Sequence, residues 1–163
     1  MKLWGPALLC AMALTACDGG MSREEFVSEA NAICEETEAS LQDLGGEAVN
    51  QQDPTEITDV AAEELGNLRD RLEELEPPDE FSDDFATMIQ GLEGAIGDID
   101  SLSQAVEESL EAEPQDEAAA EESIAEVQEI TESLTANLDE ASGAAEAMDL
   151  EDCAAASSAG ETS

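Results

Sequence analysis

Residues 81–110 read FSDDFATMIQGLEGAIGDIDSLSQAVEESL, a stretch in which apolar side chains return every three or four positions. That spacing matches the 3.6-residue turn of an α-helix and places the acidic residues on the outward positions between the apolar ones. The apolar stripe consists of Phe81, Phe85, Met88, Ile89, Leu92, Ile96, Ile99, Leu102, Val106 and Leu110. Pro114 ends the pattern, because proline cannot continue a helix interior. The stretch therefore predicts one long amphipathic helix.

Three glycines, Gly91, Gly94 and Gly97, interrupt this stripe at regular intervals. They do not form a phosphate-binding loop, because no strand precedes them and no lysine follows. Two interpretations stay open. The glycines allow close packing against another helix, or they merely loosen this one, at a cost of up to about 1 kcal/mol each relative to alanine.

The same spacing occurs in three further stretches, residues 26–44, 57–75 and 124–148. The sequence also marks where these helices start and stop. Ser22 with Glu25 three positions later predicts a capping box, and Pro54 suits the first turn of the second helix. Glycine and proline pairs at 45–46 and 77–78 break the chain between helices.

Four helices of about 20 to 30 residues with short breaks predict an all-α fold, specifically an antiparallel four-helix bundle in up-down-up-down order. We expect the bundle domain to cover residues 22–153 and the Ser/Ala-rich residues 154–163 to form a disordered tail. The alternative is an acidic, largely disordered chain, which the high charge and the small size of alanine support. Four consistent stripes, with a cysteine at each end of the domain, favour the bundle.

The composition excludes several functions. The 163 residues hold 43 acidic and 4 basic residues and no histidine, for a formal net charge of −39. Such a chain repels nucleic acid, and it lacks every catalytic pair that needs an imidazole. Asp98-Ile99-Asp100 resembles the start of a calcium loop, but Leu102 occupies a ligand position and no glycine follows. We therefore expect no catalytic residue, no metal site, no cofactor and no enzyme activity.

The first sixteen residues differ from the rest of the chain. Residues 1–16 carry one charge, Lys2, followed by an apolar run too short to span a bilayer. This pattern predicts a secretory signal peptide. Leu14-Thr15-Ala16-Cys17 resembles the bacterial lipobox, which implies lipidation of Cys17 and a membrane anchor, with residues 17–21 as the lipidated N-terminus and tether. The alternatives are an ordinary signal peptide cut after Ala16 and a buried N-terminal helix.

Two further cysteines lie in the predicted domain. Cys10 leaves with the signal peptide and Cys17 carries lipid, so Cys34 and Cys153 are the free thiols of an exported chain. Two thiols in an oxidising compartment most simply form a structural disulfide. A redox pair is the weaker alternative, because such pairs are usually close in sequence and need a positive field. In an up-down bundle Cys153 would leave the fourth helix and fold back along the first to reach Cys34.

The chain resembles small secreted lipoproteins of actinobacteria. The resemblance rests on the lipobox, on FVSEANAIC at 26–34, on LEELEPP at 72–78 and on MDLEDC at 148–153. It implies a helical domain on the outer side of the cell membrane, with Cys34 and Cys153 as a disulfide pair, and it implies no activity. Asp149 stands where a glycine is usual in this group.

Together these features predict a membrane-anchored, extracytoplasmic lipoprotein. We expect a non-catalytic helical module that binds an envelope protein or ligand, with no nucleic acid partner. The evenly spread acidity predicts a surface adapted to high salt, as in a halophilic or haloalkaliphilic source, because salt screens the self-repulsion. The alternative function is a structural or cation-buffering acidic lipoprotein with no specific partner.

Overall fold

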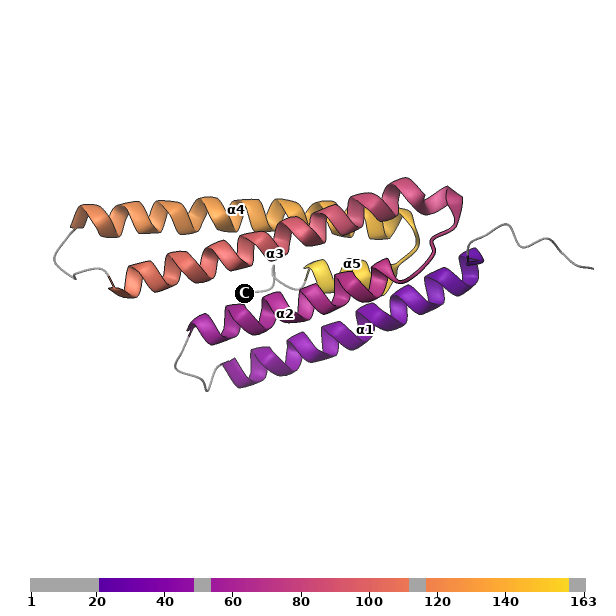
Figure 1. Cartoon of the computed structure of the whole chain (residues 1–163), viewed down its shortest axis with the longest axis horizontal. Helices are drawn as coiled ribbons and strands as arrows, with labels where there is room; N and C mark the ends of the chain where they lie inside the picture. Colours follow the sequence, from indigo (N-terminus) through magenta and orange to yellow (C-terminus); the bar gives the residue numbers. More distant parts are fainter. Residues whose placement is uncertain (1–20, 49–53, 112–116, 159–163) are drawn as a thin grey trace, which may run out of the picture.

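The computed structural model describes residues 21–48, 54–111 and 117–158, and all of its regular elements are helical. In chain order these are α1 (Arg23–Ala48), α2 (Pro54–Glu73), the short 3₁₀ helix η1 (Asp79–Phe81), α3 (Ser82–Glu111), α4 (Glu117–Ala147) and α5 (Glu151–Ser158). The predicted all-α class is confirmed. The four long helices lie lengthwise beside one another (Figure 1).

The helix starts follow local chemistry that the sequence encodes. At the start of α1 the Ser22 amide donates to a Glu25 carboxylate oxygen at 3.3 Å, and the Glu25 amide donates to the Ser22 hydroxyl oxygen at 3.3 Å. The Ser22 hydroxyl also donates to that carboxylate at 2.6 Å. This is the predicted capping box. Pro54 is the first residue of α2, where its missing N–H costs nothing. After α2, Pro77 and Pro78 precede η1, which leads into α3.

The long helices pack in chain order, and α5 completes the arrangement. α1 packs on α2, α2 on α3 and α3 on α4, while α5 packs on both α4 and α1. Among the described residues the backbones of α1 and α4 do not pack directly on each other, because α5 lies between them. α5 is therefore the element that connects the first helix to the last (Figure 1).

The hydrophobic core is concentrated at the end of the molecule that contains α5. Phe26 is fully buried, with its ring centroid 5.9 Å from that of Phe81 and 5.7 Å from that of Phe85. These ring contacts join the start of α1 to η1 and to the start of α3. The rest of the buried cluster comes from all five α-helices and from the turn between α4 and α5: Ala30, Ile33, Cys34, Leu68, Leu72, Met88, Ile89, Leu92, Ala141, Ala144, Ala145, Met148, Leu150, Cys153 and Ala154.

The expected boundary between domain and tail is wrong by at least one helical turn. α5 extends to Ser158, and Ala154 is buried in the core. Residues 154–158 therefore belong to the helical domain, whereas residues 159–163 of the expected tail lie outside the described residues. The sequence does not predict α5, because alanine contributes no strong apolar stripe. In the structure, the small alanine side chains let α5 approach α1 and α4 closely.

The three glycines of α3 have different surroundings in the structure. An added Cβ at Gly91 would lie 2.7 Å from the Asn137 carbonyl oxygen and 2.9 Å from the Ala141 amide nitrogen, and one at Gly94 would meet the Asn137 side chain. At Gly97 an added Cβ would meet nothing within 4 Å. Two of the glycines thus allow α3 and α4 to approach closely, and the third does not take part.

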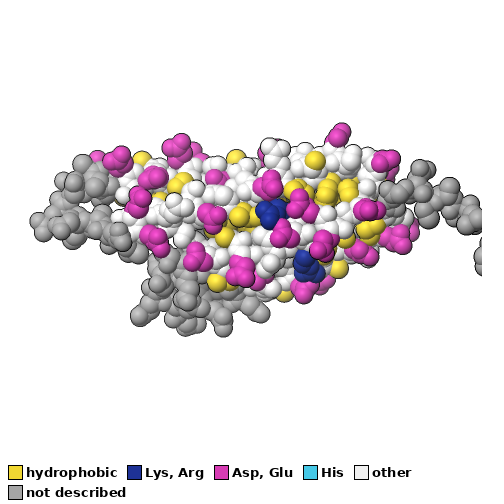
Figure 2. All heavy atoms as spheres, in the orientation of Figure 1, with side chains coloured by type: hydrophobic (Ala, Val, Ile, Leu, Met, Phe, Trp, Pro, Cys, Tyr) yellow, Lys and Arg dark blue, Asp and Glu magenta, His cyan; other side chains and the backbone are white. Residues whose placement is uncertain are grey.

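Acidic side chains cover the surface. On the face shown in Figure 2 they are spread over the whole length of the described part, and the few arginines stand among them. Arg69 and Arg71 of α2 pair with acidic neighbours. Arg71 donates to Glu36 across to α1 at 2.7 Å, and Arg69 lies 3.8 Å from Glu73 along α2. Both pairs are exposed enough that each adds at most about 1 kcal/mol.

Candidate functional site

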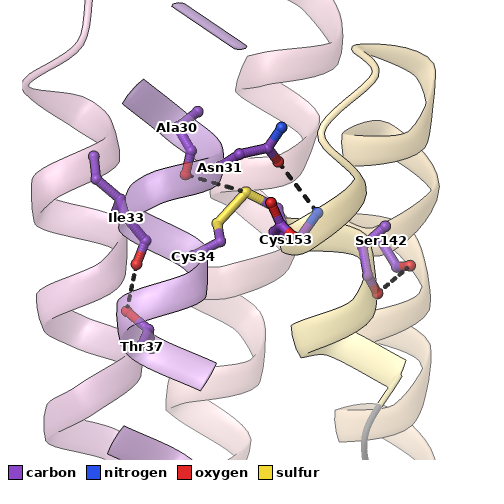
Figure 3. The surroundings of a disulfide bond; sticks show 9 residues. Ala30, Asn31, Ile33, Cys34, Thr37, Ser142 and Cys153 are labelled. Atoms are coloured by element: carbon purple, nitrogen blue, oxygen red, sulfur yellow. Dashed lines mark hydrogen bonds between the residues drawn. A yellow bond between two sulfur atoms is a disulfide. The ribbon is translucent and has the colours of Figure 1, made fainter. Parts of the chain in front are cut away.

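The predicted site residues Cys34 and Cys153 form the disulfide. Cys34 lies in α1 and Cys153 in α5, with their Cα atoms 5.0 Å apart and an S–S bond of 2.07 Å (Figure 3). The pairing expected from the sequence is confirmed. As expected, the chain folds back along α1 after the fourth helix, and α5 is the segment that does so. Cys17, the predicted lipidation site, lies outside the described residues.

The disulfide is buried and supported by polar contacts on both sides. Cys34 is fully buried and Cys153 is 5 % exposed. The Asp152 amide donates to the Asn31 side-chain oxygen at 3.2 Å, so the first turn of α5 is capped by a residue of α1 (Figure 3). On the other side of α5, the Ser142 hydroxyl donates to the Ala154 carbonyl oxygen at 3.2 Å. α5 is thus held to α1 and α4 by a covalent bond and two hydrogen bonds.

These surroundings favour a structural disulfide over a redox-active one. A reactive cysteine needs exposure to its reaction partner and a positive field that stabilises the thiolate. Cys34 is fully buried, and the small cavity beside it is lined by apolar side chains, among them Leu72 and Met88. The sulfur of Cys153 lies 3.7 Å from the Ala30 carbonyl oxygen, a contact that would repel a thiolate.

An arginine cluster lies where α1, η1 and the α4–α5 turn meet. The Arg23 guanidinium pairs with the carboxylates of Asp149 and Glu80 and stacks over the Phe81 ring, 4.9 Å from its centroid. All three charged side chains are about half exposed or more. The cluster therefore fixes the orientation of the three segments more than it adds to stability. Sequence reasoning missed it, because Arg23 and Asp149 are 126 positions apart.

The turn that Asp149 occupies explains why glycine is favoured there. Asp149 has a φ of 62°, in the left-handed region. The Leu150 amide donates to the Ala145 carbonyl at 2.9 Å, and the Asp149 amide donates to the Glu146 carbonyl at 3.1 Å. These two hydrogen bonds form a Schellman motif, whose left-handed position is usually glycine. Asp149 keeps the motif and adds a carboxylate for Arg23.

Two open hollows in the described surface are lined largely by polar side chains. The hollow between α1 and α2 has a volume of about 320 Å³ and contains the Arg71–Glu36 pair. Its lining residues are Glu36, Thr37, Ser40, Glu64, Asn67, Asp70, Arg71 and Glu74. The hollow between α4 and α5 has a volume of about 440 Å³. Ser142, Glu146, Asp149, Glu151, Ala154 and Ala155 line it.

The chemistry available in these hollows is carboxylate chemistry. The described residues contain no group of three or more His, Cys, Asp or Glu side chains arranged to hold a metal ion. All of the lining carboxylates except that of Glu64, which is half-buried, are exposed, so both hollows attract cations. The clearest carboxyl pKa shift is that of Glu25, which the hydrogen bond from Ser22 lowers. That shift belongs to a helix cap.

The comparisons with known proteins give no functional assignment. No protein-family model, no curated protein and no solved structure matches this chain. Within the described residues, no helix combines the length and the apolar character that a bilayer crossing requires. The functional argument therefore depends on the residues themselves.

Proposed function

We propose that this chain is a lipid-anchored, extracytoplasmic, non-catalytic interaction module of the cell envelope, with a surface adapted to high salt. The observation that carries the proposal is the disulfide between Cys34 and Cys153. Disulfides persist in oxidising compartments, so this bond supports export. The pattern Leu14-Thr15-Ala16-Cys17 supports the anchor, since it combines a short apolar run with a cysteine as the lipid acceptor.

The start of the folded domain fits such an anchor. The Met21 amide donates to the Glu76 carbonyl oxygen at 3.2 Å, and the Met21 side chain packs against the core. Met21 lies four positions after Cys17, a reach of at most about 14 Å when fully extended. A lipid on Cys17 would thus hold the domain close to the membrane surface, with the arginine cluster at Arg23 facing the bilayer.

The proposal includes the finer arrangement of the fold. We infer an antiparallel up-down-up-down order of the four long helices, with α5 between α1 and α4. Short connections between successive helices support this order, because they leave little chain for a crossover. A rigid helical domain of this kind presents fixed surfaces, which suits binding better than an acidic polymer would.

Lipid labelling tests the anchor. Cells expressing the chain are fed an alkyne-tagged palmitate, and the protein is separated and probed for the tag. We expect labelling and membrane association, loss of both in Cys17→Ser, and retention of both in Cys10→Ser, the matched control, which replaces a cysteine outside the lipobox and outside the disulfide. Labelling that survives Cys17→Ser, or a wild-type protein without lipid, would overturn the anchor.

Crosslinking in intact cells tests the interaction module. A module with a defined partner should give one or a few discrete adducts. The second candidate function, a cation-buffering acidic lipoprotein, is favoured by the carboxylates that line both hollows. It predicts no discrete adduct and the uptake of many Ca²⁺ ions per chain at weak, equal affinity in a calorimetric titration.

A further inference from the structure

The apolar stripe of α4 loses its cover partway along the helix. Near the C-terminal end of α4 the stripe is almost completely buried, with exposed fractions of 1 % for Ala141, 1 % for Ala145 and 0 % for Met148. Toward the N-terminal end Leu138, Leu134 and Val127 are half-buried, and Ile124 is 61 % exposed. Ile124 is the exposed large hydrophobic side chain of the described surface.

The change in burial follows the length of α5. α5 has eight residues and spans about 12 Å, whereas α4 has 31 residues and spans about 46 Å. α5 packs beside the last turns of α4 only (Figure 1). In the described part of the chain, α3 is the one helix that packs on α4 beyond the reach of α5. One side of α4 is therefore left without a helical neighbour.

The hydrogen bond from Ser142 identifies which side this is. Ser142 donates to Ala154 of α5, so it marks the side of α4 on which α5 packs. Leu138, Thr131 and Ile124 lie 4, 11 and 18 positions before Ser142, spacings that keep them on the same side of a helix. We call this row, Ile124, Thr131 and Leu138, the open row of α4. It continues the surface that α5 covers.

We propose that the open row of α4 is a docking surface for a basic amphipathic helix of a partner protein, lying in line with α5. From Ile124 to Leu138 the row spans about 21 Å, the length of a partner helix of about 14 residues. The intramolecular packing of α5 on α4 beside Ser142 shows how a helix is accommodated on this side of α4.

Charge complementarity selects a basic partner. Glu121, Glu132 and Asp139 are exposed and lie beside the open row on one rim, because each is within about 100° of it around the helix. Basic side chains on the flank of a docked helix would meet these carboxylates, while aliphatic side chains would cover Ile124 and Leu138. A second copy of this chain brings a formal charge of −39 to the same surface and is repelled at the salt concentration of the test below, about 0.1 M.

Among the described residues, α3 and α5 are the helices that pack on α4, and α5 ends before it reaches the row. The inference rests on the proposal that the chain is an interaction module, for which it names a surface and a class of partner. It does not depend on lipidation, so its failure and the failure of the lipid anchor are distinguishable.

Peptide binding tests the proposal on residues 18–163 in the oxidised form, which include the whole described core. These residues contain no Trp or Tyr, so the fluorescence of a single Trp in a peptide reports binding directly. The probe is an 18-residue amphipathic helix of Leu and Lys with one Trp. The control peptide has the same composition in scrambled order. We expect the amphipathic peptide to bind in about 0.1 M salt and the scrambled peptide to bind at least about tenfold more weakly.

Two neighbouring substitutions locate the site. Ile124→Ser removes the exposed aliphatic side chain, whereas Ala125→Ser changes an exposed residue on another side of the same helix turn. We expect Ile124→Ser to weaken the amphipathic peptide about tenfold and Ala125→Ser to leave its affinity within about twofold. Circular dichroism of both variants verifies that α4 is intact.

Three results would overturn the proposal. Equal affinity for the two peptides, or equal loss in the two variants, would show attraction by charge alone. A peptide footprint outside α4 in hydrogen exchange would place the surface elsewhere. Sedimentation that reveals a dimer of residues 18–163 dissolved by Ile124→Ser would make the row a contact between copies of this chain.

Discussion

Replacing Gly91 with alanine tests how closely α3 and α4 approach. The added Cβ would lie 2.7 Å from the Asn137 carbonyl oxygen and 2.9 Å from the Ala141 amide nitrogen. Both are backbone atoms, so they can withdraw only if the two helices separate. Overpacking of this kind costs about 1 to 3 kcal/mol, and the better helix propensity of alanine returns up to about 1 kcal/mol. We expect a net loss of about 1 kcal/mol, the middle of the range of about 0 to 2 kcal/mol that remains when the full propensity gain is returned.

Gly97→Ala is the matched control in the same helix. Its Cβ would meet nothing within 4 Å, so the gain in helix propensity acts alone. We expect Gly97→Ala to stabilise the domain by up to about 1 kcal/mol, opposite in sign to Gly91→Ala.

Denaturant unfolding followed by far-ultraviolet circular dichroism at molar salt measures both variants. A Gly91→Ala protein as stable as the wild type would refute the close approach of α3 and α4. A shift of the same sign in both variants would show that these glycines act through helix propensity only.

Three further substitutions probe the disulfide, the turn and the cap. Cys34→Ser, or reduction of the disulfide, opens a loop whose ends are 119 positions apart. We expect the free energy of unfolding, measured in denaturant, to fall by about 4 to 5 kcal/mol. An unchanged unfolding midpoint under reductant would contradict this. Asp149→Gly places glycine at a left-handed position and should stabilise the fold by about 0.5 to 1 kcal/mol, despite the loss of the ion pair with Arg23. A lower melting temperature would contradict this. Ser22 lowers the pKa of Glu25 below its ordinary 4.5, so the capping box stabilises the fold above that pH and is lost as the pH falls through the lowered value. Below pH 4.5 the free energy of unfolding of Ser22→Ala should therefore depend less on pH than that of the wild type. An equal pH dependence in the two proteins would show that the cap contributes nothing.

Local signals in the sequence predict most of the described helices. The apolar spacing, the Ser22 capping box and the prolines at 54, 77 and 78 encode helix positions, because each acts within one or two turns. The pairing of Cys34 with Cys153 follows from compartment and count, although the residues are 119 positions apart.

The features that sequence reasoning missed depend on tertiary contacts. α5 has no strong apolar stripe, and its position is fixed by Asn31, Ser142 and the disulfide, three contacts from other elements. The arginine cluster at Arg23 likewise joins three distant segments. The different roles of Gly91 and Gly97 become visible only when α4 is placed beside α3. No local pattern encodes such placements.

The candidate functional surface is also only partly predictable from the sequence. The sequence predicts an acidic, non-basic surface, and the structure adds where that surface is hollow and where an apolar row is uncovered. The exposure of Ile124 follows from the short length of α5, which the apolar spacing of α4 does not encode.

The most direct test of the account is thermal melting of oxidised residues 18–163, followed by far-ultraviolet circular dichroism from about 0.1 M salt to several molar, a range over which the Debye length falls from about 10 Å to below about 3 Å. We predict a cooperative helical transition whose midpoint rises with salt, because screening relieves the repulsion among the 43 acidic residues while the core and the disulfide hold the helices together. A coil at every salt concentration would contradict the folded module and leave a lipid-tethered acidic polymer in its place.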